Sequence, residues 1–203
     1  MPRSPARDLA PEDGRTARTA RTREAIADAV LAFLEEGRLE PTSLEIAARA
    51  GIGERTIFHH FADLEALFAE VADRQVARVL ERFSRVPATG GVRERALALA
   101  AQRADLHEFV TPVRRAALRK EPTSREIAKR LAWARALLRR DVERIFAAAL
   151  ERAPAAERAE LRAALALAAS WSAREQLRRH GGLRIARARD VVARTLLALL
   201  GEK

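Results

Sequence analysis

The sequence predicts an all-α protein, and three observations point to that fold class. Ala, Leu, Arg and Glu dominate the 203 residues, and all four are good helix formers. Apolar residues recur at helical spacing, whereas no run of alternating β-branched residues indicates a strand. Gly and Pro interrupt the helical patterns, so nine helices are expected, three in a first domain and six in a second.

The first domain is expected over residues 16–68, after an N-terminal arm of residues 1–15. The arm contains three prolines and a glycine, and it is expected to be disordered. A first helix is predicted from Thr16 to Glu36, because apolar residues recur on one face of this stretch and Gly37 can end it.

Two short helical patterns on either side of a glycine complete the first domain. Thr42 and Glu45 have the spacing of a capping box, so a helix should begin near Ser43. Gly51 stands where that helix must end, because glycine adopts a left-handed backbone at little cost. Gly53 can cap the next helix. This layout predicts a helix-turn-helix, whose second helix enters the DNA major groove.

The residues of this motif that are left pointing outward are candidate DNA contacts. They are Thr42, Ser43, Glu54, Arg55, Thr56, Phe58, His59 and His60. Arg55 is the first choice for base readout, because a guanidinium can bind a guanine edge with two hydrogen bonds. The alternative is an exposed Arg55 that pairs with Glu54. No metal site is predicted at His59 and His60, because neighbouring helical positions diverge by about 100° and no third ligand is near.

The stretch IAARAGIGERTIFHHFADLEALF, preceded by TREAIADAVLAFLEEG, resembles the DNA-binding domain of the TetR family of bacterial transcriptional regulators. The resemblance covers residues 20–70 and implies a three-helix DNA-binding domain. The family often has Tyr at the position of Phe58, Lys at that of Leu64 and Ser at that of Gly53. The first two side chains usually contact phosphates, so fewer contacts with the DNA backbone are expected here.

The net charge of +10 does not itself locate a DNA-binding surface. Residues 1–60 hold nine Arg and ten acidic residues, so the excess of positive charge lies in residues 61–203. Nearly all basic residues are Arg, which a bias in nucleotide composition explains as well as a selected surface does. Four arginines lie early in the chain, at Arg15, Arg18, Arg21 and Arg23. They could attract DNA phosphates, or they could belong to a solvated tail.

Residues 69–203 are expected to form the second domain, reached through a helix that begins after Asp63. The six helices predicted after the helix-turn-helix run over about 63–83, 92–108, a short stretch from 111, 123–152, 155–180 and 183–200. Thr123 and Glu126 form a second capping-box pattern, and Pro112 suits the first position of the short helix.

The resemblance implies that this second domain binds a small molecule and forms a dimer. Candidates for lining the pocket are His107, Phe109, Arg114, Trp133 and Leu137. Candidates for the dimer interface, on the last two helices, are Leu165, Trp171, Leu177, Val191, Leu196 and Leu199. For every residue in both sets the alternative is ordinary core packing.

Several classes of function find no support in the sequence. The chain has no cysteine, so disulfides, thiolate chemistry and zinc-thiolate sites are excluded. No nucleophile elbow, Walker loop or zinc-protease helix is present, so neither an enzyme nor a cofactor is predicted. No apolar run approaches the length of a membrane span, and no signal peptide follows the early arginines. A soluble, cytoplasmic protein is expected.

The pattern and the resemblance together predict a homodimeric transcriptional regulator. We expect a ligand-responsive repressor that binds a pseudo-palindromic, double-stranded operator and responds to a small-molecule effector of unknown identity. One alternative is a helical protein that binds a small molecule or a partner and binds DNA weakly or not at all. Another is a basic helical protein at a membrane surface, which would use its Arg-rich last helix.

Overall fold

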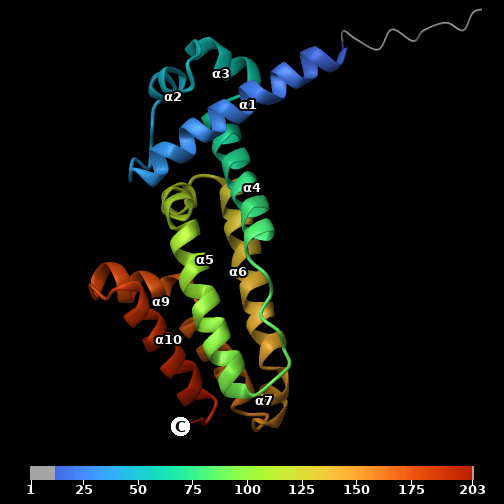
Figure 1. Cartoon of the computed structure of the whole chain (residues 1–203), viewed down its shortest axis with the longest axis vertical. Helices are drawn as coiled ribbons and strands as arrows, with labels where there is room; N and C mark the ends of the chain where they lie inside the picture. Colours follow the sequence, from blue (N-terminus) through green and yellow to red (C-terminus); the bar gives the residue numbers. More distant parts are fainter. Residues whose placement is uncertain (1–11, 203) are drawn as a thin grey trace, which may run out of the picture. The chain divides into compact units, whose positions relative to one another are not determined.

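The structure is a computed structural model that describes residues 12–202, and within that range it contains helices and no strand (Figure 1). This confirms the predicted all-α fold class. The chain divides into two compact units, Met1–Arg74 and Gln75–Lys203. The division falls inside a helix, six residues beyond the boundary expected at residue 68. None of the described helices is both long and apolar enough to cross a bilayer.

The first unit is built from three helices and the start of a fourth. These are α1 (Glu12–Glu35), α2 (Ser43–Ala50), α3 (Glu54–His60) and the first part of α4 (Leu64–Arg82). Because α1 begins at Glu12, residues 12–15 of the expected arm are helical, and residues 1–11 lie outside the described residues. The core joins apolar side chains of all four helices, among them Ile26, Val30, Leu34, Ile46, Ala47, Ile57 and Leu67.

Local capping fixes both ends of α2. The Thr42 hydroxyl accepts a hydrogen bond from the Glu45 N–H at 3.3 Å, and a Glu45 carboxylate oxygen accepts one from the Thr42 N–H at 2.9 Å. Gly51 has φ 68° and ψ 32°, the left-handed conformation that ends the helix. The hydrogen bond from the Thr42 backbone, with help from the Arg38 side chain, lowers the pKa of Glu45 to about 2. The predicted capping box and glycine stop are therefore both present.

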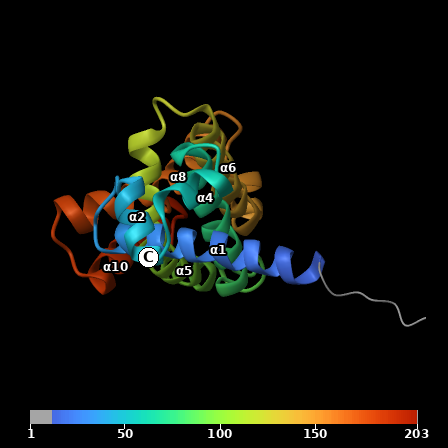
Figure 2. The same cartoon turned by 90° about the horizontal axis from the view of Figure 1, so that it is seen from above.

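The second unit is organised around two long helices. Its elements after the end of α4 are α5 (Val92–Lys120), α6 (Arg125–Ile145), α7 (Ala147–Arg152), α8 (Arg158–Ala168), α9 (Trp171–Glu175), the π-helical segment η1 (Gln176–His180) and α10 (Ile185–Leu199). The packing of α10 along α5 is the most extensive between any two of these helices, while α6 contacts both α5 and α8 (Figures 1 and 2). The core of the unit lies between these helices.

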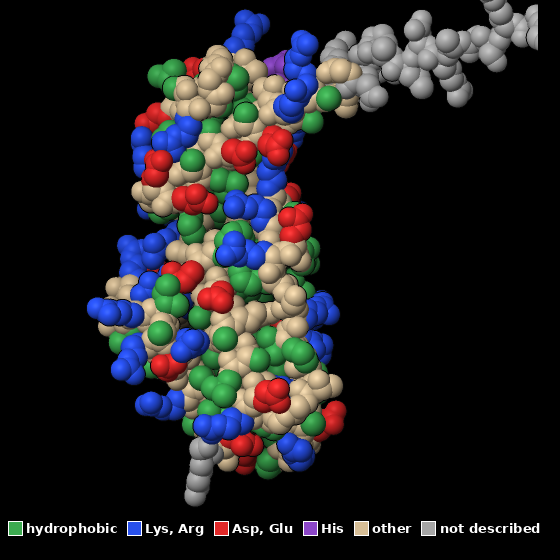
Figure 3. Space-filling model, viewed as in Figure 1, with side chains coloured by type: hydrophobic (Ala, Val, Ile, Leu, Met, Phe, Trp, Pro, Cys, Tyr) green, Lys and Arg blue, Asp and Glu red, His purple; other side chains and the backbone are tan. Residues whose placement is uncertain are grey.

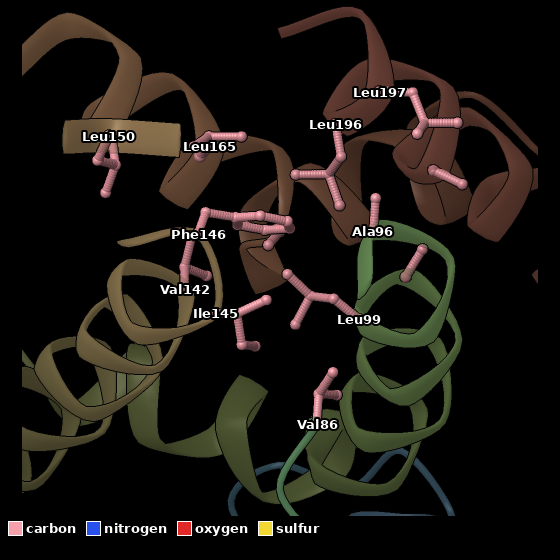
Figure 4. Close-up of a cluster of buried hydrophobic side chains, with 13 residues drawn as sticks. Val86, Ala96, Leu99, Val142, Ile145, Phe146, Leu150, Leu165, Leu196 and Leu197 are labelled. Carbon is pink, nitrogen blue, oxygen red and sulfur yellow. The ribbon is translucent and has the colours of Figure 1, made fainter. Parts of the chain in front are cut away.

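Figure 4 shows how this core is filled. Phe146 and Ile145, at the end of α6, point towards Leu99 of α5 and Leu196 of α10. Leu165 of α8 joins the same cluster, and all five side chains are fully buried. Helices far apart in the sequence are therefore held by one continuous apolar cluster.

One predicted break in the second unit is wrong, because α5 runs through Pro112 without ending. Pro112 has no N–H and so gives no hydrogen bond to the carbonyl of Glu108. The helix nevertheless continues, since Leu106, Thr111 and Ala116 on both sides of the proline are buried. Tertiary packing here outweighs the local preference of proline for a helix start.

Two predicted helices are instead shorter than expected. The helix expected over residues 123–152 begins at Arg125. Its cap is Ser124, whose hydroxyl accepts a hydrogen bond from the Ile127 N–H at 3.1 Å. It is interrupted at Phe146, which is fully buried. The helix expected over residues 155–180 is interrupted at Ser170, whose hydroxyl accepts from the Ala173 N–H at 3.1 Å and starts α9.

Replacing Thr42 with Ala should lower the free energy of unfolding by about 1 kcal/mol, because the variant loses the side-chain cap of α2. Urea denaturation followed by circular dichroism measures the change. The matched control is Thr19→Ala, at an exposed position inside α1, where alanine should be neutral or slightly stabilising. Equal losses in the two variants would contradict the capping role of Thr42.

Candidate functional site

The outward face of α3 follows from the burial of a single side chain. Ile57 is fully buried, and positions two before and two after it lie roughly 160° away around a helix. Those positions are Arg55 and His59, and both are exposed. Thr56 and His60 lie on one flank and are partly buried. The centre of the exposed face is therefore a guanidinium and an imidazole one turn apart.

Arg55 is free to contact a ligand. Within residues 12–202 it makes no ion pair, and its neighbour Glu54 instead accepts a hydrogen bond from the Ser43 hydroxyl at 2.5 Å. The expected alternative, an Arg55–Glu54 pair, is therefore not found. The Ser43–Glu54 bond joins the start of α2 to the start of α3, and it places a carboxylate at a helix N-terminus, where negative charge is favourable.

The end of α3 is held by Arg23, a residue that the sequence suggested for the N-terminal arm. Its guanidinium donates to the carbonyl of His60 at 2.6 Å and lies 4.4 Å from the ring centre of Phe61. The same group forms an ion pair with Glu70 of α4. Arg23 therefore ties α1, α3 and α4 together and is not available for a phosphate. The sequence contained no signal for this long-range contact.

The remaining residues at the ends of α2 and α3 take more limited roles. The Thr42 hydroxyl is engaged with Glu45, 3.0 Å from a carboxylate oxygen. Burial, and then the charges of His59 and Arg23, lower the pKa of His60, so this imidazole is neutral at pH 7. A neutral His60 adds no positive charge to the surface.

Two large apolar side chains of this unit are exposed. Leu44 of α2 is 66% exposed. It lies two residues before the buried Ile46, so a helical backbone turns it to the opposite side. Phe58 is 47% exposed and belongs to the outward part of α3. Having no hydroxyl, Phe58 offers a DNA backbone only apolar contact.

The second unit contains a small cavity between α5, α8, α9, η1 and α10. The space open to the centre of a water molecule is about 20 Å³, which holds one or two waters. Its lining residues are Ala100, Arg103, Ala104, His107, Glu108, Ala168, Ala169, Ser170, Arg174, Arg178, Ile185, Ala188, Arg189 and Val192. Four arginines and one glutamate therefore face a largely apolar space.

Of the five residues predicted to line a pocket, the structure brings only His107 to this cavity. Trp133 is 51% exposed on α6, which places it on the surface. Phe109 packs against the end of α4, 5.7 Å from Phe83 between ring centres. The Arg114 guanidinium lies 5.2 Å from the centre of the Trp171 ring, and Leu137 is partly buried outside the cavity. The cavity arginines were missed, because in a chain rich in Arg no local pattern marks them.

Burial lowers the pKa of two side chains in this unit, His107 and Arg114. His107 is 2% exposed, and burial, followed by the charges of Arg103, Arg114 and Arg174, lowers its pKa to about 3. The imidazole is therefore neutral at pH 7. Burial likewise lowers the pKa of Arg114, to about 10, at which the guanidinium remains charged at pH 7.

The residues predicted for a dimer interface fall into two groups. Leu165 and Leu196 are fully buried in the core of their own protomer, and Trp171 is 8% exposed, so the structure places these three side chains in the interior of the protomer. Val191 is exposed, while Leu177 and Leu199 are partly buried. Leu167, also on α8, is 65% exposed. It lies two residues from Leu165, on the opposite side of the helix.

Charges of both signs are mixed on the face of the molecule that Figure 3 draws. Figure 3 shows Lys and Arg interspersed with Asp and Glu on the visible side. Among the described residues, no group of three or more His, Cys, Asp or Glu side chains is placed to hold a metal ion.

Comparisons with known proteins agree with this geometry. Residues 25–71 match the family described as bacterial regulatory proteins, tetR family. A transcriptional regulator from Rhodococcus sp. Rha1 has a similar solved structure, with a TM-score of 0.68 and 19% identity over 88% of this chain and 96% of that chain. A putative TetR-family transcriptional regulator from Mesorhizobium loti MAFF303099 has a TM-score of 0.60 and 20% identity over 91% of this chain and 97% of that chain. A search of curated proteins found no match.

The burial of His107 predicts a pH dependence of stability. Its pKa is about 3 in the folded state against 6.5 for a free histidine, so the unfolded chain binds more protons between these values. Stability should therefore fall as the pH is lowered from 6.5, by about 1 kcal/mol per pH unit. Urea denaturation at pH 7.5, 6.5 and 5.5 measures this loss.

In the His107→Leu variant, the decrease in the free energy of unfolding between pH 6.5 and 5.5 should be about 1 kcal/mol smaller than in the wild type. His180→Leu, at an exposed position of η1, is the matched control and should keep the wild-type slope. The assignment fails if His107→Leu leaves the pH dependence unchanged.

Proposed function

We propose that this chain, whose residues 25–71 match the tetR family of bacterial regulatory proteins, acts as a ligand-responsive repressor that binds a pseudo-palindromic operator as a homodimer. The observation that carries the proposal is the exposed pair Arg55 and His59 on the face of α3 opposite the buried Ile57. In a helix-turn-helix this is the face that enters the major groove.

Arg55 is proposed to read a base. It lies in the first turn of α3, where recognition helices contact base edges, and its guanidinium is unpaired within the described residues. A guanidinium donates two hydrogen bonds to O6 and N7 of guanine. His59, one turn later, is proposed to contact a neighbouring base edge or phosphate.

The residues around this pair are proposed to set the register on the DNA backbone. Thr42 and Ser43 lie at the N-terminus of α2, where backbone N–H groups suit a phosphate, although both hydroxyls already bond to Glu45 and Glu54. Thr56 flanks Arg55 on α3 and can meet a phosphate or a thymine methyl group. Phe58 supplies no hydrogen bond, so one phosphate contact fewer is expected than for a Tyr at this position.

A homodimer is proposed because one helix-turn-helix contacts only a few base pairs. Exposed apolar residues of α8 and α10 support an interface there, namely Leu167 and Val191, which are 65% and 37% exposed. Two copies that bury these faces around a two-fold axis would present two recognition helices to two operator half-sites.

Effector binding is proposed to act through α4, whose second half belongs to the second unit. The Gln75 side chain donates to the carbonyl of Phe109 at 3.2 Å, and the guanidinium groups of Arg78 and Arg82 lie 5.2 and 5.1 Å from the centre of the Phe109 ring. Phe109 follows the cavity residue His107 by two positions. A change of α5 at the cavity would therefore reach α4 directly.

A shift of α4 would change the separation of the two recognition helices. Operator half-sites accept separations near one turn of DNA, roughly 34–36 Å, or its multiples, so a modest movement suffices to weaken binding. The effector need prefer the state with low DNA affinity by only a few kcal/mol.

A second candidate function is a ligand-binding or partner-binding helical protein with weak or lost DNA binding. Phe58, exposed and without a hydroxyl, favours it, as does the slight acidic excess of residues 1–60. A mobility-shift titration with DNA flanking the gene, repeated at several salt concentrations, separates the two functions. Retention of one sequence over random DNA supports the regulator, and no retention at low salt supports the alternative.

Arg55→Ala should weaken binding to the cognate operator by about 1–3 kcal/mol and relax the preference for one base pair. The reason is the loss of a bidentate contact to a base edge. Competition mobility shifts against operators substituted at each position measure both effects. Arg139→Ala, at an exposed arginine of α6, is the control for lost charge and should bind within twofold of wild type. An equal loss on operator and random DNA would make Arg55 a phosphate contact instead.

Leu167→Glu should convert the dimer to a monomer and abolish high-affinity operator binding while leaving the protomer folded. A carboxylate at this 65% exposed position would be buried without a partner in the proposed interface, which is costly. Sedimentation velocity measures the oligomeric state, and circular dichroism the fold. The control is Leu97→Glu, at a 46% exposed position of α5, which should remain dimeric. A dimeric Leu167→Glu variant would place the interface elsewhere.

A further inference from the structure

Small side chains make room for the cavity in the second unit. Ala100 and Ala104 lie on α5 one turn apart, Ala168 and Ala169 end α8, and Ala188 faces them from α10. Burial increases from one side of the cavity to the other. Ile185, at 43%, is its most exposed apolar lining residue and marks the open side, whereas His107 on the deep side is 2% exposed.

Two polar groups on the deep side have no hydrogen-bond partner among the described residues. They are Nε2 of His107 and Nε of Arg103, and the two residues are 2% and 3% exposed. They lie one turn apart on α5 and both line the cavity. Buried polar groups are almost always paired, so two unpaired groups at one cavity require an explanation. An oxygen atom in the cavity could accept from the Arg103 N–H and bond to the neutral imidazole of His107.

The charges around the cavity favour an anion. Seven arginines share only four carboxylates in the ion pairs of this region. Arg174 and Arg178 share Glu108, at 2.7 and 2.9 Å, and Glu108 is the only acidic residue of the lining. The carboxylates therefore leave an excess of positive charge that is partly shielded from water.

We propose that this cavity binds the carboxylate group of a small organic acid, whose apolar tail extends past Val192 and Ile185 to the open side. A carboxylate is planar and small, and it presents two acceptor oxygens to guanidinium and imidazole groups. A tetrahedral phosphate is less suited to a space of about 20 Å³. Val192 and Ile185 give the tail apolar contact.

The role of this acid as an effector rests on the proposed function, whereas its binding to the cavity does not. His107 lines the cavity, and Phe109, two residues later on α5, accepts a hydrogen bond from Gln75 of α4 through its carbonyl. A ligand that moves α5 at the cavity would therefore also move the contact with α4. The acid would then weaken operator binding.

The test uses the full chain without DNA and measures binding of sodium butyrate and sodium benzoate by isothermal titration calorimetry and thermal melting. The matched neutral amides, butyramide and benzamide, are the ligand controls, and NaCl holds the ionic strength constant. At 20 mM each acid should raise the melting temperature by at least about 2 °C, and each amide by less than about 0.5 °C. Between pH 6 and 8 the affinity should be constant, because His107 stays neutral.

Variants locate the binding at the cavity. Arg189→Gln, at the cavity but 47% exposed in its side chain, should weaken the affinity at least about fivefold without unfolding the protein. The matched control, Arg187→Gln on the same helix, removes the same charge away from the lining and should change the affinity less than about twofold. His107→Leu should weaken it at least about tenfold, and the exposed position of Arg189 keeps the test decisive if this variant does not fold.

Each outcome of the titrations decides the matter. No binding of either acid at 20 mM, equal binding of the amides, or equal losses in Arg187→Gln and Arg189→Gln would overturn the inference. If the protein binds the acids but does not bind the operator DNA, the cavity inference is upheld and the proposed function is overturned. Operator binding that neither acid changes, together with binding to the cavity, would uphold the site and remove its role as the effector site.

Discussion

The side of α3 that faces outward is fixed by tertiary contacts, and the DNA-binding proposal depends on this constraint. A helix of seven residues has no stability of its own in water. Burying Ile57 chooses its rotation, and the bond from Arg23 to the carbonyl of His60 holds its C-terminal end. These two contacts involve only the buried side and the C-terminal end of α3. The exposed positions are therefore not needed to hold the helix in place. That is why Arg55 can be left unpaired.

The second unit shows the opposite arrangement, in which charged groups are placed inside. Burial lowers the pKa of Arg103, although its ion pair with Asp141 at 2.9 Å opposes that change. A buried guanidinium that keeps one N–H unpaired costs stability, and an apolar residue of similar size would avoid that cost. Stability alone therefore does not explain why Arg103 and His107 meet at one cavity. An acidic ligand that completes their hydrogen bonds would explain it.

The sequence predicted local features well and long-range ones poorly. The capping pair Thr42 and Glu45 and the stop at Gly51 were found because each depends only on residues within one turn. Pro112 was misread because the packing of α5 is decided by residues far along the chain. Leu165 and Leu167 could not be distinguished, since both are apolar and the phase of their helix is set by its neighbours.

The cavity arginines and Arg23 were unpredictable for a related reason. Several of their ion pairs join residues far apart in the sequence, as in Arg23–Glu70, Arg103–Asp141 and Glu108–Arg178, which are 47, 38 and 70 positions apart. In a chain whose basic residues are nearly all Arg, composition gives no means of choosing among them.

The segment of α5 between His107 and Pro112 connects the cavity with α4, and its hydrogen bonds show why it is suited to that task. Pro112 gives the carbonyl of Glu108 no hydrogen bond, so this turn is held less by the helix itself. Other elements supply the contacts instead. The Trp171 indole N–H donates to the Thr111 hydroxyl at 2.9 Å, and that hydroxyl donates to the carbonyl of His107 at 2.5 Å. The position of the turn is therefore set jointly by α9, which borders the cavity, and by α4 through Phe109. The proposed effector mechanism would use this turn, which has one fewer helical hydrogen bond to resist a change at either border.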